Sequence, residues 1–377
     1  MKKIKIVTVV GTRPEIIRLS SVIKKLNESK IFEHILIHTG QNYDYELNQI
    51  FFDDLKIQEP DYFLDCAGNS GISTVGNILI KIEPILLEIR PSAFLILGDT
   101  NSCLSAIAAR KLKIPIFHME AGNRCFDLRV PEESNRKIVD HISDINLCYS
   151  DIARNYLLDE GLKKDQIITT GSPMFEVLGT HLKSINSSEI LNKLNLKMDK
   201  YFLVSAHREE NVTSKKDLSQ LINSLNSLAL LYGFPIIFST HPRTKNMIEK
   251  FKLKTESLII FSKPFGFFDY VNLQVNSLVT LSDSGTISEE SSILNFRALN
   301  LRVSHERPEA FEEASVPFVG TCEERIIQGV KLVMDQRKGL ERNFNLVKDY
   351  SSNNVSLKVE RIIFSYINFI TKRNWDE

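Results

Sequence analysis

Residues 4–15 read IKIVTVVGTRPE, and this stretch decides the fold. The run of β-branched residues predicts a short, buried strand. Thr12 followed three residues later by Glu15 is a capping-box pattern, and Pro14 suits the first turn of a helix, so a helix should begin here. Backbone N–H groups at such a helix start bind anions, and Arg13 would add a charge-assisted hydrogen bond to a phosphate. A plain helix start with a solvated Arg13 explains the same residues equally well.

The alternation of apolar runs with amphipathic stretches continues along the chain. Strands are predicted at Ile4–Val10, Ile35–Thr39, Ala93–Leu97, Ile114–His118, Ile145–Cys148, Phe202–Ser205, Pro235–Ser239, Leu258–Phe261 and Leu278–Leu281. Helical patterns such as Glu15–Glu28 and Ser73–Ile89 separate them, which favours βαβ units and parallel sheets. We therefore predict an α/β protein of two Rossmann-like, doubly wound domains facing a cleft. Their predicted extents are residues 1–171 and 172–352.

Composition excludes several classes of partner. Lys plus Arg and Asp plus Glu both number 47 in the 377 residues, so the net charge is zero and neither a nucleic acid nor a membrane surface is an expected partner. The five cysteines have no zinc-binding spacing, so we expect no metal. No apolar run reaches 18 residues, and the first apolar run lacks a cleavage site. These features predict a cytoplasmic protein without membrane insertion.

Three acidic positions follow or neighbour predicted strand ends in the first half. Asp99 and Glu120 each come after an apolar strand, and Glu132 belongs to a carboxylate pair at a predicted helix start. We expect these acidic sites to converge beside three arginines, Arg13, Arg124 and Arg136. Like charges at close range would raise at least one pKa towards working pH, as acid/base chemistry needs. A salt-bridge network is the alternative, Asp99 could simply cap a helix, and His118 is more typical of a core histidine.

The second half carries basic and small residues at its strand ends. His207 and Arg208 follow one strand, and His241 and Arg243 follow another, a pattern that suits a diphosphate or two solvated loops. The turn Asp283-Ser284-Gly285-Thr286 would let a phosphate approach its backbone N–H groups, and Glu290 could bind ribose hydroxyls. An ordinary Ser/Gly helix start is the alternative. Neither a strand-linked G-x-G-x-x-G nor a P-loop pattern occurs.

Taken in order, these motifs resemble one family across nearly the whole chain. They are Gly11-Thr12-Arg13-Pro14-Glu15, Thr39-Gly40-Gln41, Gly98-Asp99-Thr100, His118-Met119-Glu120-Ala121-Gly122, Pro131-Glu132-Glu133-Ser134-Asn135-Arg136, Asp283-Ser284-Gly285 and Glu306-Arg307-Pro308-Glu309. The set is similar to the non-hydrolysing UDP-N-acetylglucosamine 2-epimerases. The resemblance implies a glycosyltransferase-B type fold, a helix at about 355–372 that packs back on the first domain, and a homodimer. It also implies elimination of UDP after removal of H2 to give a 2-acetamidoglycal, then re-addition of UDP, with no cofactor.

The resemblance also implies roles for individual residues. Asp99, Glu120 and Glu132 would move the C2 proton with support from Arg136, and which carboxylate is the base stays open. His207 would contact UDP and belongs with this catalytic set. The other implied UDP contacts are Arg13, Arg18, Phe265, Tyr270, Ser284, Gly285, Thr286, Glu290 and Arg307.

Several positions depart from the family pattern. Arg18 stands where the family has Lys, Asn42 where it has His, and Gly68-Asn69 where it has Gly-Gln preceded by Arg. The last two places help bacterial members bind a second, activating UDP-GlcNAc. We therefore predict that this enzyme does not need that activator.

The short segment from Gly122 to Val130, which contains Asn-Arg-Cys-Phe, resembles the branch of UDP-N-acetyl-L-fucosamine synthesis. That branch epimerises UDP-2-acetamido-2,6-dideoxy-L-talose for capsule or O-antigen, and an apolar Phe126 would suit the C6 methyl group. Phe126 could equally only anchor the loop. UDP-GlcNAc/UDP-ManNAc epimerisation, a hydrolysing epimerase, a glycosyltransferase and an inactive sugar-nucleotide binder remain alternatives. The three acidic positions argue against the binder, which would need only the UDP contacts.

Overall fold

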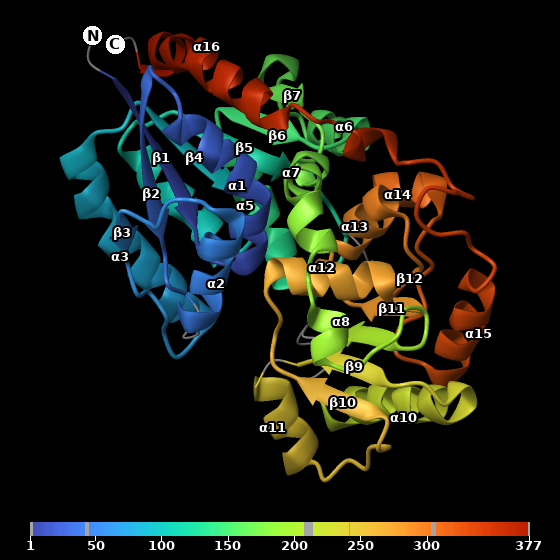
Figure 1. The fold of residues 1–377 in the computed structure, drawn as a ribbon. Helices are drawn as coiled ribbons and strands as arrows, with labels where there is room; N and C mark the ends of the chain where they lie inside the picture. The colour runs from blue at the N-terminus through green and yellow to red at the C-terminus, as the bar shows by residue number, and fades with distance from the viewer. Residues whose placement is uncertain (1–2, 42–44, 207–213, 241, 303–306, 376–377) are drawn as a thin grey trace. The chain divides into compact units, whose positions relative to one another are not determined.

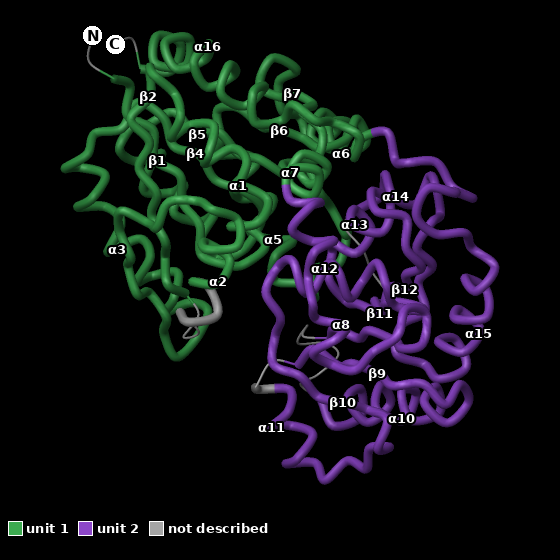
Figure 2. Tube along the Cα trace, in the orientation of Figure 1, with its two compact units in different colours: residues 1–180, 349–377 green, residues 181–348 purple. Residues whose placement is uncertain are grey.

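The computed structural model describes residues 3–41, 45–206, 214–240, 242–302 and 307–375, and the side chains of 45–48, 242 and 243 also lie outside the description. Within this range the chain divides into two compact units (Figure 2). Unit 1 comprises Met1–Thr180 and Asp349–Glu377, and unit 2 comprises His181–Lys348. Unit 2 is therefore continuous in sequence, whereas unit 1 is built from two segments.

Unit 1 contains a seven-stranded parallel sheet with the order β3-β2-β1-β4-β5-β6-β7 (Figure 1). The strands are β1 (Ile4–Val10), β2 (Phe32–His38), β3 (Tyr62–Phe63), β4 (Ala93–Leu97), β5 (Ile116–Ala121), β6 (Ile145–Cys148) and β7 (Ile167–Thr169). Strand β1 lies between β2 and β4, so the strand order reverses direction beside it. This reversal creates a topological switch point, where doubly wound sheets bind ligands.

Helices cover both faces of this sheet. They are α1 (Arg13–Asn27), α2 (Tyr45–Leu55), α3 (Gly71–Ile89), α4 (Ala106–Lys111), α5 (Pro131–Ile142), α6 (Asp151–Asp159) and α16 (Val355–Trp375), with short 3₁₀ turns at Asn101–Ser105 and Lys164–Gln166. Helix α7 (Met174–Asn186) and the 3₁₀ turn Lys348–Tyr350 contain the two points where the chain passes between the units. Helix α3 packs Ile78, Ile82 and Leu86 into one core with Val7 and Val9 of β1. Helix α16 contacts α1, so the second segment of unit 1 completes the unit begun by the first.

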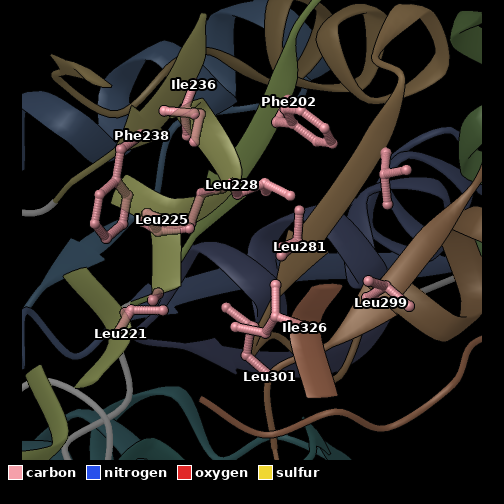
Figure 3. Packing of buried hydrophobic residues seen from close by; sticks show 14 of the residues in the cluster. Phe202, Leu221, Leu225, Leu228, Ile236, Phe238, Leu281, Leu299, Leu301 and Ile326 are labelled. Atoms are coloured by element: carbon pink, nitrogen blue, oxygen red, sulfur yellow. The ribbon is translucent and has the colours of Figure 1, made fainter. Parts of the chain in front are cut away.

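Unit 2 repeats the architecture with a five-stranded parallel sheet of order β10-β9-β8-β11-β12. The strands are β8 (Phe202–Ser205), β9 (Ile236–Ser239), β10 (Ile259–Ser262), β11 (Val279–Ser282) and β12 (Ala298–Asn300). The helices are α8 (Ile190–Lys193), α10 (Lys215–Tyr232), α11 (Pro242–Lys250), α12 (Phe267–Asn276), α13 (Ile287–Leu294), α14 (Pro308–Glu313) and α15 (Glu323–Val333). Its core joins Phe202 and Phe238 of the sheet to Leu225 of α10 and Ile326 of α15 (Figure 3).

The two parallel sheets flanked by helices confirm the predicted α/β class. Every strand predicted from sequence is present, with ends that differ by a few residues at most. The three shortest strands, β3, β7 and β12, were not predicted. No helix in the described ranges is long and apolar enough to cross a membrane.

Candidate functional site

Several of the predicted site residues lie at or just after the carboxyl ends of strands in the two sheets. In unit 1 the turn after β1 and the turn after β4 flank the first switch point. In unit 2 the turns after β8 and β11 flank the second.

The turn between β1 and α1 is organised by Glu15. Its carboxylate accepts hydrogen bonds from the amides of Gly11 (2.5 Å) and Thr12 (2.9 Å) and from the hydroxyls of Thr100 (2.6 Å) and Ser102 (2.5 Å). The bond to the Thr12 amide is the carboxylate half of the predicted capping box. Burial raises the pKa of Glu15, and the four donors act in the opposite direction. Glu15 therefore ties the first turn to the turn that follows β4.

Gly11 allows this close approach of neighbouring turns. A Cβ atom at Gly11 would lie 2.2 Å from the hydroxyl of Thr39, so no other residue fits without a shift. Gln41, next in the same turn after β2, donates from Nε2 to the Thr100 hydroxyl (3.1 Å). Arg13 places its guanidinium 5.8 Å from the centre of the Phe51 ring.

Asp99 is held by the helix that follows β5, and does not cap the turn at Asn101–Ser105, whose N-cap residue is Thr100. Arg136 Nε donates to Oδ2 of Asp99 (2.7 Å), and Arg136 Nη2 lies 2.6 Å from the same oxygen. Asn135 donates to the Asp99 carbonyl (2.8 Å). Two neighbouring residues of α5 thus fix both the side chain and the backbone of Asp99.

Glu120 occupies an irregular position in β5. Its φ of +63° lies in the left-handed region, and the register of β5 against β6 shifts between Met119 and Ala121. Such a bulge redirects a side chain and often occurs beside active sites. The Glu120 carboxylate forms a buried ion pair with Arg18, in which Nη1 and Oε2 are 2.5 Å apart. Asp99 and Glu120 are thus each paired with an arginine, as the salt-bridge alternative expected.

The carboxylate pair at the start of α5 divides into two environments. Glu132 is partly buried in the first turn of α5, whereas Glu133 is fully buried. Glu133 accepts from the amides of Cys125 (3.1 Å) and Phe126 (3.2 Å) and from Arg136 Nη1 (2.8 Å). Burial alone would raise the pKa of Glu133, but these bonds from the Cys125 amide and Arg136 bring it below its ordinary value. Glu133 therefore fastens the loop after β5 to the arginine that holds Asp99.

His118 and Asp140 connect the turn after β4 to the loop after β5. Nε2 of His118 donates to the Gly98 carbonyl (2.8 Å), and its Nδ1 lies 2.9 Å from Oδ1 of Asp140. Asp140 also accepts from the Gly122 amide (3.2 Å) and from Arg124 (2.7 Å). Burial alone would raise the pKa of Asp140, but His118 and Arg124 hold it below its ordinary value. His118 is thus a buried histidine, and it supports the backbone next to Asp99.

In unit 2, the turn after β11 is a compact set of hydroxyl and amide groups. The Ser284 amide donates to Ser282 Oγ (3.1 Å), and the Thr286 amide donates to Ser284 Oγ (3.3 Å). The hydroxyls of Ser284 and Thr286 are 2.9 Å apart. Gly285 lies between them, partly exposed, and α13 begins directly afterwards. The turn therefore has the strand-to-helix form that was predicted for a phosphate site.

Helix α12 lies against this turn. The Tyr270 hydroxyl hydrogen-bonds with Ser205 at the end of β8 and Ser282 at the end of β11. Burial, with the nearby charge of Glu290, raises the pKa of Tyr270, so its phenol stays protonated. One turn further along α12, Gln274 Nε2 donates to Oε2 of the buried Glu290 (2.6 Å).

The remaining predicted contacts have diverse surroundings. Phe265 packs with Tyr270 against the core cluster that contains Tyr201 and Leu273. Arg307 is buried, and its Nη2 lies 3.5 Å from Glu289. His207 lies outside the described residues, as do His241 and Asn42. Among the described residues, no three His, Cys, Asp or Glu side chains form a group suited to a metal ion.

Sequence reasoning missed three residues that organise these sites. Glu133 was seen only as half of a pair, and Asp140 and Gln274 were not singled out. A polar residue within an apolar helix face is the one signal that marks Asp140 and Gln274, and it does not identify their partners.

Comparison with known proteins identifies the family. Residues 24–364 match the family described as UDP-N-acetylglucosamine 2-epimerase. The solved structure of a UDP-N-acetylglucosamine 2-epimerase from Rickettsia bellii is 48% identical, with a TM-score of 0.92 over 100% of both chains. The Methanocaldococcus jannaschii UDP-GlcNAc 2-epimerase, solved with UDP-GlcNAc and UDP, is 34% identical, with a TM-score of 0.89 over 96% of this chain and 100% of that one.

A third relative acts on a different sugar. The UDP-2,3-diacetamido-2,3-dideoxy-D-glucuronate 2-epimerase of Pseudomonas aeruginosa is 33% identical over 87% of this chain and 91% of that protein. The relatives therefore share the 2-epimerase name and differ in the sugar. By the family match and these similarities, the chain belongs to the UDP-N-acetylglucosamine 2-epimerase family, a family of sugar-nucleotide isomerases.

Proposed function

We propose that this enzyme inverts C2 of a UDP-linked, N-acetylated hexosamine by eliminating and re-adding UDP. A base takes H2 as the C1–O bond to UDP breaks, which yields a 2-acetamidoglycal and free UDP. Re-addition of the diphosphate at C1, with protonation of C2 from the opposite side, gives the epimer. Because C2–H is weakly acidic, cations at the departing diphosphate must share the work with the base.

The observation that carries this proposal is the pairing of Asp99 with Arg136 and of Glu120 with Arg18 at one edge of the first sheet. Proton transfer at both faces of C2 needs two positioned carboxyl groups, and each pair holds one of them in a defined direction. Glu132, in the first turn of the helix that carries Arg136, is the third candidate. The base is one of these three.

For UDP, the proposal uses the turn after β11 and the groups around it. Ser284, Gly285 and Thr286 at the start of α13 suit the diphosphate, because a helix N-terminus favours anions. Glu290 accepts hydrogen bonds from the ribose hydroxyls. Phe265 and Tyr270 lie near the uracil ring. Arg13, Arg18, Arg307 and His207 complete the proposed contacts.

We further propose UDP-2-acetamido-2,6-dideoxy-L-talose as the preferred substrate, with UDP-N-acetyl-L-fucosamine as the product. The support is the loop after β5: Glu133 accepts from the Cys125 and Phe126 amides and is paired with Arg136, which also binds Asp99, and the Phe126 side chain stays 69% exposed. An exposed aromatic ring anchored to the acid/base cluster suits a sugar with a methyl group at C6. Phe126 also packs edge-on against Tyr156, so the ring has a fixed direction.

UDP-GlcNAc is the second candidate, favoured by the names of the Rickettsia and Methanocaldococcus relatives. The test incubates the enzyme with each nucleotide in D2O and follows C2 by NMR. The proposal expects intact, C2-deuterated epimer and a kcat/KM at least ~10-fold higher for the 6-deoxy sugar, since one methyl group in a pocket is worth about this much. Free sugar released together with UDP would indicate hydrolysis, and no exchange at C2 would refute epimerisation.

A matched pair of variants tests the role of the loop. Phe126→Ser should lower kcat/KM for the 6-deoxy sugar about 10-fold and leave UDP-GlcNAc turnover unchanged. Leu128→Ser, an exposed apolar residue of the same loop, should change neither. If Phe126→Ser lowers kcat/KM equally for both sugars, Phe126 only anchors the loop and does not select the substrate.

We also propose a cytoplasmic homodimer that serves capsule or O-antigen synthesis. Ile72, Ile80 and Leu87 of α3 are exposed and follow one another at helical spacing, opposite the stripe that faces the core. A second copy covering this stripe would remove it from water, and light scattering of Ile80→Glu would show a monomer.

All five cysteines are free thiols, which supports a reducing compartment. Independence from a UDP-GlcNAc activator also stays part of the proposal, and saturable activation would refute it.

A further inference from the structure

The contact between Gln274 and Glu290 is unusual for a buried pair. Gln274 is fully buried on α12, and Glu290 is 6% exposed on α13. Gln274 Nε2 donates to Glu290 Oε2 at 2.6 Å, a short distance for an amide donor. The other end of the carboxamide, Oε1, is buried and has no hydrogen-bond partner among the described residues.

The chemistry of this contact differs from that of an ion pair. An amide N–H favours the ionised carboxylate and fixes its direction without adding a positive charge. A carboxylate can accept about four hydrogen bonds, so a bond from Gln274 leaves capacity for hydroxyl donors. A glutamine kept only for packing would be expected to have both ends of its carboxamide bonded. Among the described residues, the Gln274 carboxamide therefore has the Glu290 carboxylate as its hydrogen-bond partner.

The position of α12 links this contact to the rest of the site. Tyr270 and Gln274 are four residues apart, so they project from the same face of α12. Tyr270 reaches Ser205 and Ser282, which end β8 and β11, and Gln274 reaches the helix that follows β11. One face of α12 thus contacts the strand ends beside the turn after β11 and also orients the Glu290 carboxylate.

We propose that Gln274 is a positioning residue that makes the enzyme select ribonucleotides over 2′-deoxyribonucleotides. It holds the Glu290 carboxylate in the orientation that receives the vicinal hydroxyls of ribose. The inference rests on the proposed UDP site and extends it, because it assigns nucleotide selectivity to a residue that need not touch the nucleotide. Without Gln274, the carboxylate loses the amide donor that fixes its direction, and the hydroxyl contacts that distinguish the two sugars weaken.

The experiment measures dissociation constants of UDP and 2′-deoxy-UDP by calorimetry for the full chain and the variant Gln274→Met. Met keeps the volume and removes the amide donor. For the wild type we expect UDP to bind at least ~10-fold more tightly than 2′-deoxy-UDP. For Gln274→Met we expect the dissociation constant of UDP to rise about 10-fold and that of 2′-deoxy-UDP to change less than 2-fold. The ratio of the two dissociation constants, which measures selectivity for ribose, then falls about 10-fold. In turnover, KM should rise while kcat stays within 2-fold.

Two controls separate positioning from general damage. Asn276→Leu removes a different amide of α12, which donates to Asn272, and should keep the wild-type ratio. Gln274→Met introduced into Glu290→Gln should cause no further loss of selectivity, because the carboxylate to be positioned is absent. If Gln274→Met does not fold, the wild type supplies the test through the side-chain amide resonance of Gln274, which should shift more with UDP than with 2′-deoxy-UDP.

The outcomes distinguish this inference from the function on which it rests. A wild-type ratio in folded Gln274→Met, equal weakening of both ligands, or equal amide shifts with both ligands overturns the role of Gln274 while the UDP site stands. A wild type that binds neither ligand overturns the UDP site and the inference together.

Discussion

The two units use carboxylates in different ways. In unit 1, Asp99 and Glu120 lie within 2.6 Å of the guanidinium groups of Arg136 and Arg18. In unit 2, Glu290 is held at the same distance by the neutral amide of Gln274. A guanidinium both orients a carboxylate and offsets its charge, whereas an amide only orients it.

This difference matches the chemistry that each site is proposed to perform. A proton at C2 must be taken and returned, and a carboxylate for that task needs a defined direction in a site that stays close to neutral. Recognition of hydroxyl groups needs an acceptor in a fixed place and no balancing cation. In this comparison, the carboxylates proposed for proton transfer have guanidinium partners, and Glu290, proposed for binding, has the Gln274 amide as a partner.

Arg136→Met should have the strongest consequence, because Arg136 serves both Asp99 and the fully buried Glu133. Leaving the buried Glu133 carboxylate without this partner should lower stability by ~3–5 kcal/mol. We expect kcat/KM to fall at least ~1000-fold, about 4 kcal/mol in the barrier. Deuterium exchange at C2 and urea unfolding measure the two effects.

The control for this variant is Arg129→Met. Arg129 also forms a close pair with an aspartate, Asp127, in the loop just before α5, but its side chain is 85% exposed. An exposed pair contributes little, so neither activity nor stability should change. Equal losses in both variants would mean that the environment of the pair does not matter.

Arg18 provides a narrower test, since it contacts the proposed catalytic carboxylate Glu120. Arg18→Met should lower kcat about 100-fold, while Arg18→Lys, which keeps the charge and is the usual family residue, should lower it less than 10-fold. A substitution by Met that leaves kcat unchanged would show that Glu120 needs no cation. Single-turnover measurements separate this effect from binding.

Unit 1 should also lose stability in acid through His38. Its ring stacks on Phe63, its Nδ1 accepts from the Gly40 amide, and burial lowers the pKa of His38 to about 4. As pH falls below 6.5 the unfolded chain gains a proton on this residue and the folded chain does not, so stability is lost between pH 6.5 and 4, by up to about 3 kcal/mol. His38→Gln should flatten this dependence in urea titrations, and His141→Gln, at the surface, should not.

The mildest change is expected from Ser284→Ala in unit 2. It removes the hydroxyl that contacts Thr286 and accepts from the Thr286 amide. Loss of such neutral hydrogen bonds costs about 1 kcal/mol, so KM for the UDP-sugar should rise about 5-fold with kcat preserved. Ser187→Ala, which removes a serine hydroxyl bonded to the Ser184 carbonyl in the same unit, is the matched control. A fall in kcat would place Ser284 in the chemical step.

Sequence periodicity was sufficient for the fold because buried parallel strands are nearly continuous apolar runs. β1, β4, β6 and β8 were predicted with the same limits that the structure has. β3 and β7 contain two and three residues, which is too short for any pattern to stand out from a loop. Strand pairing defines them, and pairing partners are distant in sequence.

The candidate site was partly predictable for a similar reason. Asp99 and Glu120 could be located because residues at the ends of parallel strands meet at one edge of a sheet. Their pairing with Arg136 and Arg18 depends on rotamers and on the bulge at Glu120, neither of which a sequence pattern specifies. The same is true of Gln274, whose partner lies on another helix.

The division of unit 1 into two segments has a consequence for synthesis of the protein. Helix α16, which contacts α1, leaves the ribosome only after the whole of unit 2. Unit 2 is continuous, so all of its native contacts are available once residue 348 has emerged. The face of α1 that α16 covers therefore stays exposed to solvent while the ribosome synthesises unit 2. Chaperone contacts with nascent chains should concentrate on that face.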